Sequence, residues 1–218
     1  MTDDTLEAPA VTRAADVLPE IELLALQPTL ERIARLKQER RAVVLAHNYM
    51  TPDIYHLVAD VTGDSLALAR MAVETDADVI VMAGVHFMAE TAKALNPDRT
   101  VLIPDLRAGC SLADSITAAD IAALRAKHPG VPVVTYVNTS AEVKAASDIC
   151  CTSGNAVQVV ESLGVDRVLF LPDRYLGRWV ATQTDVEVIL WDGACEVHER
   201  FTGDQVLDYR GAFDDLAV

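Results

Sequence analysis

Cys110 and Cys195 are the residues whose types and spacing most directly indicate chemistry in this chain. Each follows a strand-like apolar run and opens a predicted helix, and the two positions are 85 residues apart. A single buried cysteine usually serves as a small hydrophobic side chain. Two cysteines at matching points of repeated segments instead predict two ligands of one shared centre. The chain has no Cys-x-x-Cys pair, which argues against a structural zinc site.

The other two cysteines, Cys150 and Cys151, are adjacent and precede a predicted helix. Adjacent thiols are poorly placed to ligate one cluster together, so we expect both to pack as core residues. A thiol switch is the alternative. Four cysteines in a chain of 218 residues are too few for a disulfide framework.

A second group of candidate residues follows predicted strands. His47 and Tyr49 flank Asn48 at the end of one apolar segment, and Tyr136 and Asn138 lie on one face at the end of another. Ligands of parallel sheets bind beyond the carboxyl ends of the strands. These side chains are therefore candidates for substrate contacts, and the alternative is that they are ordinary polar residues.

Three further candidates lie near predicted helix starts. Ser65 and Ser153 each lie at a predicted helix N-terminus, where a hydroxyl beside free backbone N–H groups suits an anion. Simple helix capping is their alternative role. His198 comes three residues after Cys195, about one helical turn, and so can face the same cavity as that thiol.

Apolar patterning predicts the elements that must position these residues. A long helix with one apolar face opens the ordered part of the chain and spans residues 20–40. That face comprises Leu23, Leu24, Leu30, Ile33 and Leu36. The predicted strands are 41–49, 78–83, 100–104, 131–138, 166–171 and 186–190. The predicted helices between them are 53–61, 65–74 with Asp64 as its cap, 87–95, 117–127, one that opens at 152–154, and 173–181.

The order of these elements repeats along the chain. The segment 166–171 (DRVLFL) matches 78–83 (DVIVMA) at an offset of 88 residues, and 152–154 matches 63–65 at nearly the same offset. A period of about 85–90 residues indicates a repeated β-α-β-α-β unit. Continuous apolar strands between helices predict small parallel sheets that are covered on both faces.

We therefore predict an α/β protein of pseudo-repeated three-layer α/β/α domains, with two complete repeats and the start of a third. The expected segments are an N-terminal arm and helix over 1–40, repeats over 41–110 and 111–195, and an incomplete third repeat over 196–218. Residues 1–19 are expected to form a loose arm.

Composition narrows the function classes. The net charge of −15 at pH 7 argues against nucleic acids and anionic membranes as partners. No apolar run approaches the ~20 residues of a membrane-spanning helix, and the acidic N-terminus lacks a signal-peptide core. We therefore expect a cytoplasmic protein.

Eight segments together resemble quinolinate synthase of the iron–sulfur type, over about Leu36 to Thr202. They are AHNY, GDSLALA, VHFMAETAK, AGCSLAD, VTYVNTSAEVKAASD, CTSGNAVQVV, FLPDRYLG and CEVHERF. The resemblance implies three similar α/β domains around a central active site. It also implies condensation of iminoaspartate with dihydroxyacetone phosphate to quinolinate, the precursor of the NAD pyridine ring. An iminoaspartate-producing aspartate oxidase or dehydrogenase is the protein partner that this reaction suggests.

The resemblance also implies the roles of single residues. A [4Fe–4S] cluster would take one cysteine from each domain, and Cys110 and Cys195 would be two of the three ligands. Three thiolates leave one iron open to act as a Lewis acid in dehydration. The implied substrate contacts are His47, Ser65, Tyr136, Val137, Asn138 and Ser153. The implied catalytic residues are Tyr49 and His198.

The sequence departs from the family pattern after Cys195. The third repeat, its cluster cysteine and its substrate-contacting His-Pro-Glu segment have no counterpart before Val218. We therefore expect a C-terminally truncated relative that is inactive, or nearly so, as it stands. Two other interpretations stay open: a catalytically inactive scaffold, and a ligand-binding α/β module without a cluster.

Overall fold

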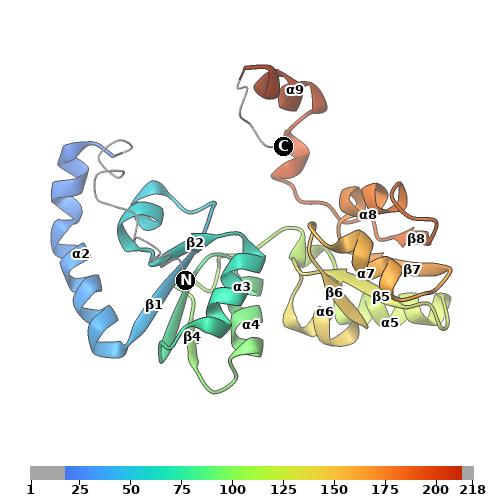
Figure 1. Ribbon diagram of the computed structural model, residues 1–218, viewed down its shortest axis with the longest axis horizontal. Helices are drawn as coiled ribbons and strands as arrows, with labels where there is room; N and C mark the ends of the chain where they lie inside the picture. Colours follow the sequence, from blue (N-terminus) through green and yellow to red (C-terminus); the bar gives the residue numbers. More distant parts are fainter. Residues whose placement is uncertain (1–17, 213–218) are drawn as a thin grey trace, which may run out of the picture. The chain divides into compact units, whose positions relative to one another are not determined.

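The computed structural model describes residues 18–212 and shows two compact α/β units that divide between Gly109 and Cys110 (Figure 1). Most of the predicted N-terminal arm lies outside the described residues, as does the tail from residue 213. Each unit is a four-stranded parallel sheet with helices on both faces. The predicted repeated three-layer α/β/α fold is therefore confirmed.

The first unit has the strand order β2-β1-β3-β4. Its elements are α2 (Glu20–Arg40), β1 (Ala42–His47), a π-helical turn (Ile54–Val58), β2 (Val61–Gly63), α3 (Ser65–Glu74), β3 (Val79–Ala83), α4 (His86–Leu95) and β4 (Thr100–Leu102). Helix α2 covers one face of the sheet, and α3 and α4 pack together on the other (Figure 1). Every strand pairing is parallel, so the carboxyl ends of the strands share one edge of the sheet.

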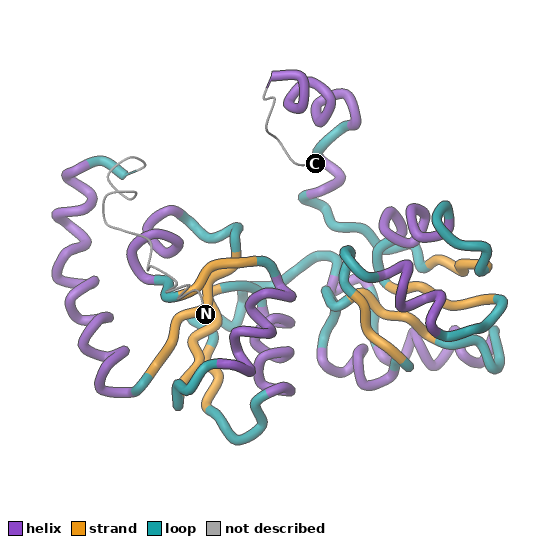
Figure 2. The backbone as a smooth tube through the Cα atoms, viewed as in Figure 1, coloured by secondary structure: helices purple, strands orange, loops and turns teal. Residues whose placement is uncertain are grey.

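The second unit repeats this plan with the strand order β6-β5-β7-β8. Its elements are α5 (Ala118–Lys127), β5 (Val133–Tyr136), α6 (Ala141–Ala146), β6 (Ile149–Cys151), α7 (Ala156–Ser162), β7 (Arg167–Leu171), α8 (Arg174–Ala181) and β8 (Glu187–Leu190). Helices α5 and α6 cover one face of this sheet, and α7 and α8 cover the other (Figure 1). Figure 2 shows the same succession of helices and strands in both units.

Three short elements complete the second unit. The 3-10 turn η2 (Ala113–Ser115) precedes α5, and the 3-10 turn η3 (His198–Arg200) follows β8. Helix α9 (Gly203–Ala212) ends the described chain. Within residues 18–212, no helix combines the length and the apolar character that crossing a bilayer requires.

The core of the second unit follows from alternation along its strands. Val133 faces a cluster with Leu169 and Leu171 under α5 and α6, whereas Val134 faces a cluster with Val168 and Phe170 under α7 and α8. Successive side chains of a strand point to opposite faces, so a strand covered on both sides must be apolar throughout. Strand β7 meets this requirement, because it is buried from Val168 to Leu171.

Each sheet has one edge strand that the apolar pattern did not predict. Strands β2 and β6 are three residues long, and β2 begins inside the segment that was predicted to be a helix over 53–61. That helix is instead a π-helical turn that ends at Val58. The short helix α6 was also missed. A three-residue strand is too short to show a periodic pattern, which explains why β2 and β6 were not predicted.

A repeated carboxylate joins each of these edge strands to the centre of its sheet. Asp60 Oδ2 accepts the N–H of Val44 at 2.8 Å, and the other carboxylate oxygen of Asp60 pairs with Lys37 Nζ at 2.5 Å. In the second unit, Asp148 Oδ2 accepts the N–H of Val133 at 2.7 Å and pairs with Arg125 at 2.9 Å. The two aspartates are 88 residues apart, which is the offset predicted for the repeat.

Helix α2 has the predicted bounds, but its inward face is different. The partly buried positions are Leu23, Leu26, Leu30, Ile33 and Lys37. Leu24 and Leu36, which were assigned to the apolar face, are exposed. Steps of three and four residues keep one face of a helix together, and Leu24 and Leu36 each lie one position off that stripe.

Candidate functional site

The two candidate ligand cysteines both belong to the second unit and begin matching turns. Cys110 O accepts the N–H of Asp114 at 2.9 Å, and Cys195 O accepts the N–H of Glu199 at 3.0 Å. The prediction that each cysteine opens a helix is wrong in detail. Each is followed by a short 3-10 turn, η2 or η3, because the chain turns again within a few residues.

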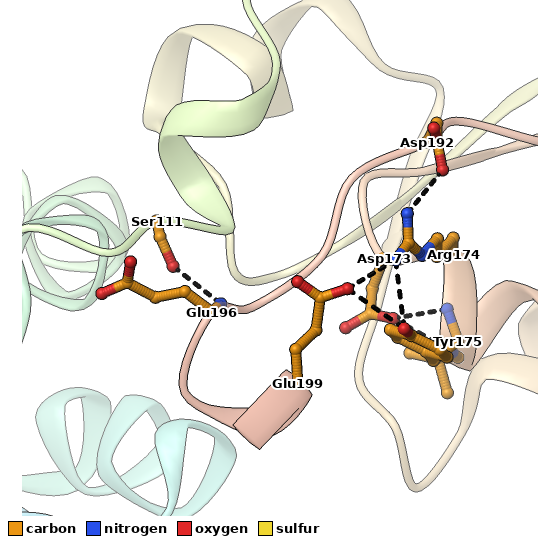
Figure 3. A network of polar contacts seen from close by, with 8 residues as sticks. Ser111, Asp173, Arg174, Tyr175, Asp192, Glu196 and Glu199 are labelled. Atoms are coloured by element: carbon orange, nitrogen blue, oxygen red, sulfur yellow. Dashed lines mark hydrogen bonds and ion pairs between the residues drawn. The ribbon is translucent and has the colours of Figure 1, made fainter. Parts of the chain in front are cut away.

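Hydrogen bonds join the two cysteine segments to each other. The N–H of Glu196 donates to Ser111 Oγ at 3.2 Å, as Figure 3 shows. The indole N–H of Trp191 donates to the carbonyl oxygen of Ser115 at 3.0 Å. The first bond joins the residues that directly follow the two cysteines. The structure therefore brings together the two segments that the sequence predicted to share a centre.

Gly193 allows this close approach. A Cβ at Gly193 would lie 2.5 Å from Pro172 O and 2.6 Å from Ser115 Oγ. Real Cβ contacts are essentially never that short, and the Pro172 carbonyl belongs to the backbone and cannot swing away. Any larger residue at this position would push the segment before Cys195 away from the segment that contains Ser115.

The thiol of Cys110 has an environment that suits a bound cation. Burial raises its pKa, and this outweighs the backbone N–H groups of Leu112 and Ala113, which favour the thiolate. A negative charge on Cys195 would raise the pKa of Cys110 further, as does Asp114. A positive charge close to Cys110, such as that of a metal ion, would favour its thiolate against these effects.

The other two cysteines lie on β6 rather than just before a helix. Cys151 is buried in the core under α7 and α8, as expected, and burial raises its pKa to about 12. Cys150 is exposed, which corrects the expectation that it packs in the core. Neighbouring residues of a strand point to opposite faces, so only one of the two can face that core.

Tyr136, Val137 and Asn138 lie at the carboxyl end of β5. Tyr136 is the last residue of the strand, and the N–H of Val137 donates to Cys151 O at 2.9 Å. The side-chain oxygen of Asn138 is buried and has no hydrogen-bond partner. Among the described residues it shares this state only with Nδ1 of His56. An orphaned buried acceptor is costly, so its presence supports a ligand donor at this position.

Ser153 does not lie at a helix start. It is exposed in the turn that joins β6 to α7, and Asn155 is the residue that precedes the helix. The side chain of Asn155 is directed back to this turn, where its oxygen accepts the N–H of Thr152 at 2.6 Å. The prediction that Ser153 lies at a helix N-terminus is therefore wrong. His198, the first residue of η3, is exposed.

In the first unit, His47 ends β1 and Tyr49 follows in the turn. Nδ1 of His47 accepts the N–H of Tyr49 at 3.2 Å, and the two rings meet edge to face with centroids 4.6 Å apart. Burial lowers the pKa of His47, and the Asp64 carboxylate offsets part of that effect. The neutral ring with Nδ1 as acceptor carries its proton on Nε2, which leaves one donor for a ligand.

Ser65 is the first residue of α3, and Asp64 is its cap, as predicted. One carboxylate oxygen of Asp64 accepts the N–H groups of Leu66 at 2.9 Å and Ala67 at 2.8 Å. These donors are therefore already occupied. An anion at this terminus would compete with the carboxylate, which weakens the prediction that Ser65 binds one there.

No group of three or more His, Cys, Asp or Glu side chains able to hold a metal ion occurs among residues 18–212. The candidate ligands found are the pair Cys110 and Cys195. The residues that join their segments, above all Ser111 and Trp191, were not predicted from the sequence. One signal was available, because Ser111 and Glu196 have the same spacing of 85 residues as the two cysteines.

Comparison with known proteins identifies one family. Residues 31–218 match the family model described as quinolinate synthetase A protein, NadA. The chain is 68% identical over 206 residues to the quinolinate synthase of Agrobacterium fabrum, which covers 94% of this chain and 60% of that protein. It is 70% identical over 190 residues to quinolinate synthase 2 of Mesorhizobium japonicum, which covers 87% of this chain and 59% of that protein.

A third relative gives the same picture. The quinolinate synthase of Xylella fastidiosa strain Temecula1 is 67% identical over 181 residues, which covers 83% of this chain and 53% of that protein. The chain thus spans between 53% and 60% of the length of these three relatives.

Proposed function

The chain belongs to the quinolinate synthetase A family, and on that premise we propose that it serves the condensation of iminoaspartate with dihydroxyacetone phosphate to quinolinate in NAD biosynthesis. The observation that carries the proposal is the junction of the Cys110 and Cys195 segments through Ser111 and Glu196. Relatives with 57–70% identity to this chain are named quinolinate synthases. An enzyme that supplies iminoaspartate and a cytoplasmic location stay predictions.

We propose Cys110 and Cys195 as two ligands of a [4Fe–4S] cluster. The donor set suits this group, because thiolates are the ligands that iron–sulfur clusters take and backbone N–H groups face the Cys110 sulfur. When bound, such a cluster supplies a Lewis-acidic iron for dehydration. The described residues contain no third ligand beside this pair.

The remaining candidates would bind substrates and move protons. In the second unit, the buried oxygen of Asn138 can accept a hydrogen bond from a substrate N–H or O–H group, with Tyr136 and Val137 beside it. In the first unit, the Nε2–H of His47 can donate to a carboxylate or phosphate oxygen. Tyr49 is 75% exposed, so its phenol can approach a substrate as a proton donor.

The weaker candidates are Ser65, Ser153 and His198. All three keep a substrate or catalytic role in the proposal, and each hydroxyl or ring is accessible at least in part. A helix terminus supports neither serine, because Asp64 already accepts two N–H groups at the start of α3 and Ser153 lies outside α7. The remaining support for Ser65, Ser153 and His198 is the family match of the segments that contain them, GDSLALA, CTSGNAVQVV and CEVHERF. We likewise propose residues 196–218 as the start of a third repeat.

A chimera tests the proposed function. In the chimera, this chain is substituted for the matching region of the Agrobacterium fabrum relative. Quinolinate formation is then measured anaerobically after cluster reconstitution. The chimera should form quinolinate at a rate comparable to the relative, and Cys110→Ser or Cys195→Ser should remove both iron and activity. A folded chimera without activity, or an active chimera with either serine variant, would overturn the proposal.

An inactive scaffold is the second candidate, and the absence of a third ligand among the described residues favours it for the chain as it stands. Iron and acid-labile sulfide counts on the 218-residue chain separate the two. About four irons per chain after reconstitution would support an intact cluster. Substoichiometric iron that a chelator removes would support the scaffold.

A further inference from the structure

We propose that Arg174 is a positioning residue that closes the loop carrying Cys195 and His198, an inference that rests on the proposed function for its catalytic consequence. Arg174 begins α8, and no role was predicted for it from the sequence. Its guanidinium reaches both ends of the loop over residues 192–199 (Figure 3). Both candidate residues lie between the two points that it holds.

At the start of the loop, Arg174 makes two contacts. Its Nη1 pairs with Asp192 Oδ1 at 2.8 Å, and its backbone N–H donates to Gly193 O at 2.9 Å. The Asp192 side chain is 88% exposed, so that ion pair by itself contributes little. The backbone bond fixes Gly193, which already approaches Pro172 and Ser115 closely.

At the end of the loop, two donors converge on one carboxylate oxygen. Arg174 Nη2 pairs with Glu199 Oε1 at 2.5 Å, and the Tyr175 hydroxyl donates to the same oxygen at 3.1 Å. Arg174 Nη2 also donates to the Tyr175 hydroxyl at 3.1 Å, and the guanidinium lies 4.9 Å from the Tyr175 ring centroid. A planar guanidinium can make these contacts together, whereas an ammonium cannot.

Glu199 connects Arg174 to Cys195. The backbone N–H of Glu199 donates to Cys195 O at 3.0 Å, so the residue that pairs with Arg174 is hydrogen-bonded to the candidate ligand. On the other side, Glu196 is fixed to Ser111 in the Cys110 segment. The loop is therefore held from α8 through Glu199 and from the first cysteine segment through Ser111. Such supporting contacts orient metal ligands without touching the metal.

The residues of this contact network come from two of the segments that resemble the family. Arg174 and Tyr175 belong to the segment FLPDRYLG, and Glu199 belongs to CEVHERF. The Asp173 side chain accepts the N–H groups of Tyr175 at 2.8 Å and Leu176 at 2.9 Å, which fixes the first turn of α8. The guanidinium thus projects from a capped helix start onto a loop that has no regular structure before η3.

Cadmium binding to the 218-residue chain tests the inference, because Cd²⁺ is a thiophilic probe with an ultraviolet thiolate charge-transfer band. Arg174→Gln should weaken Cd²⁺ binding at least about tenfold, the usual cost of losing a supporting contact. Arg174→Lys should recover part of that loss. Arg167→Gln, which removes the 2.9 Å pair of Arg167 with Glu187 on the same sheet, should leave Cd²⁺ affinity unchanged.

Two measurements keep the outcomes separate. Circular dichroism and thermal unfolding must match between the Arg174 and Arg167 variants, and the charge-transfer band must vanish in Cys110→Ser and Cys195→Ser. Unchanged Cd²⁺ affinity in folded Arg174→Gln, or a band that survives either serine variant, would overturn the inference.

The same substitutions in the chimera separate this inference from the proposed function. Arg174→Gln should lower the iron content and kcat of an active chimera, with the Lys variant intermediate and the Arg167 variant unaffected. An active chimera that Arg174→Gln leaves unaltered would overturn the positioning role and leave the proposed function standing. An inactive chimera in which Arg174→Gln still weakens Cd²⁺ binding would overturn the proposed function and leave the positioning role of Arg174 standing.

Discussion

The backbone N–H of Glu196 donates to the hydroxyl oxygen of Ser111 at 3.2 Å, although 85 residues separate the two. Each of these residues directly follows a cysteine. The bond therefore joins the backbone beside one candidate ligand to the side chain beside the other. The indole of Trp191 supports it by donating to Ser115 O, one turn further along the first segment.

Replacing Ser111 with alanine should loosen this junction. The Glu196 N–H is exposed to water, so the free energy of unfolding should fall by no more than about 1 kcal/mol. The Cd²⁺ affinity of Cys110 and Cys195 should fall by a larger fraction than the free energy of unfolding. The reason is that the lost hydrogen bond holds the two cysteine segments in place. Ser162→Ala is the matched control, since its hydroxyl donates to Val159 O at 2.7 Å elsewhere in the unit. Equal Cd²⁺ affinities in the two variants would contradict the prediction.

Much of the fold could be predicted from periodicity. The strands β3, β7 and β8 were found within a residue or two, because buried parallel strands are continuous apolar runs between helices. Helix α3 and its cap Asp64 were also found, since an aspartate before an apolar helical stripe is a local signal. Elements with a local pattern could thus be predicted.

Elements without a local pattern could not be predicted. Strand β6 is defined by its pairing with β5, and no pattern of three residues reveals a partner. Exposure of Cys150 follows from that pairing. The role of Arg174 depends on Asp192 and Glu199, which lie 18 and 25 residues away. The candidate cysteines could be predicted from repeat spacing, but the contacts that hold them required the tertiary structure.

The repeated aspartates should stabilise both sheets. Asp60→Asn and Asp148→Asn should each lower the free energy of unfolding by about 1–3 kcal/mol, because each carboxylate accepts a backbone N–H and pairs with a cation. Asp78→Asn is the control. Its pair with Arg41 joins two side chains that are each about two-thirds exposed, so the change should stay within about 0.5 kcal/mol. Urea unfolding measures all three, and equal losses would refute the distinction.

The cysteines of β6 should differ in alkylation. The pKa of Cys151 is about 12, so only about one molecule in ten thousand carries its thiolate at pH 8. Burial also restricts reagent access to Cys151, whereas Cys150 is exposed. Iodoacetamide labelling followed by mass spectrometry should modify Cys150 well before Cys151. Faster labelling of Cys151 would show that β6 is not paired as described.

Protonation of His47 should lower stability at mildly acidic pH. Its folded-state pKa lies below the unfolded value of 6.5, so the folded chain binds fewer protons in the interval between the two. The free energy of unfolding should therefore fall as pH drops through about 6.5 and level off below the folded pKa. His47→Gln should remove this part of the pH dependence.

Asp64→Asn provides the matched variant for His47. Asparagine still caps α3, but it removes the negative charge that raises the pKa of His47. The ring protons of His47, followed by NMR titration, should then report a still lower pKa. A pKa that rises in Asp64→Asn would contradict this account of the site.

Asn138 should be less important for stability than for binding. Its side-chain oxygen is buried without a partner, and an unsatisfied buried acceptor costs about 1–3 kcal/mol. Asn138→Leu removes that oxygen at similar volume, so urea unfolding should show an unchanged or higher free energy of unfolding. In the chimera, the same substitution should raise KM or abolish quinolinate formation, because the acceptor for the substrate is lost.

Asn155→Leu is the control for Asn138, since Asn155 Oδ1 accepts the Thr152 N–H at 2.6 Å and its hydroxyl at 3.0 Å. Both changes replace the same amide with the same alkyl group. Only Asn155→Leu breaks existing hydrogen bonds, so it alone should lower the free energy of unfolding, by about 1–2 kcal/mol. If Asn138→Leu destabilises the chain as much, its oxygen is already satisfied in the folded protein and does not await a ligand.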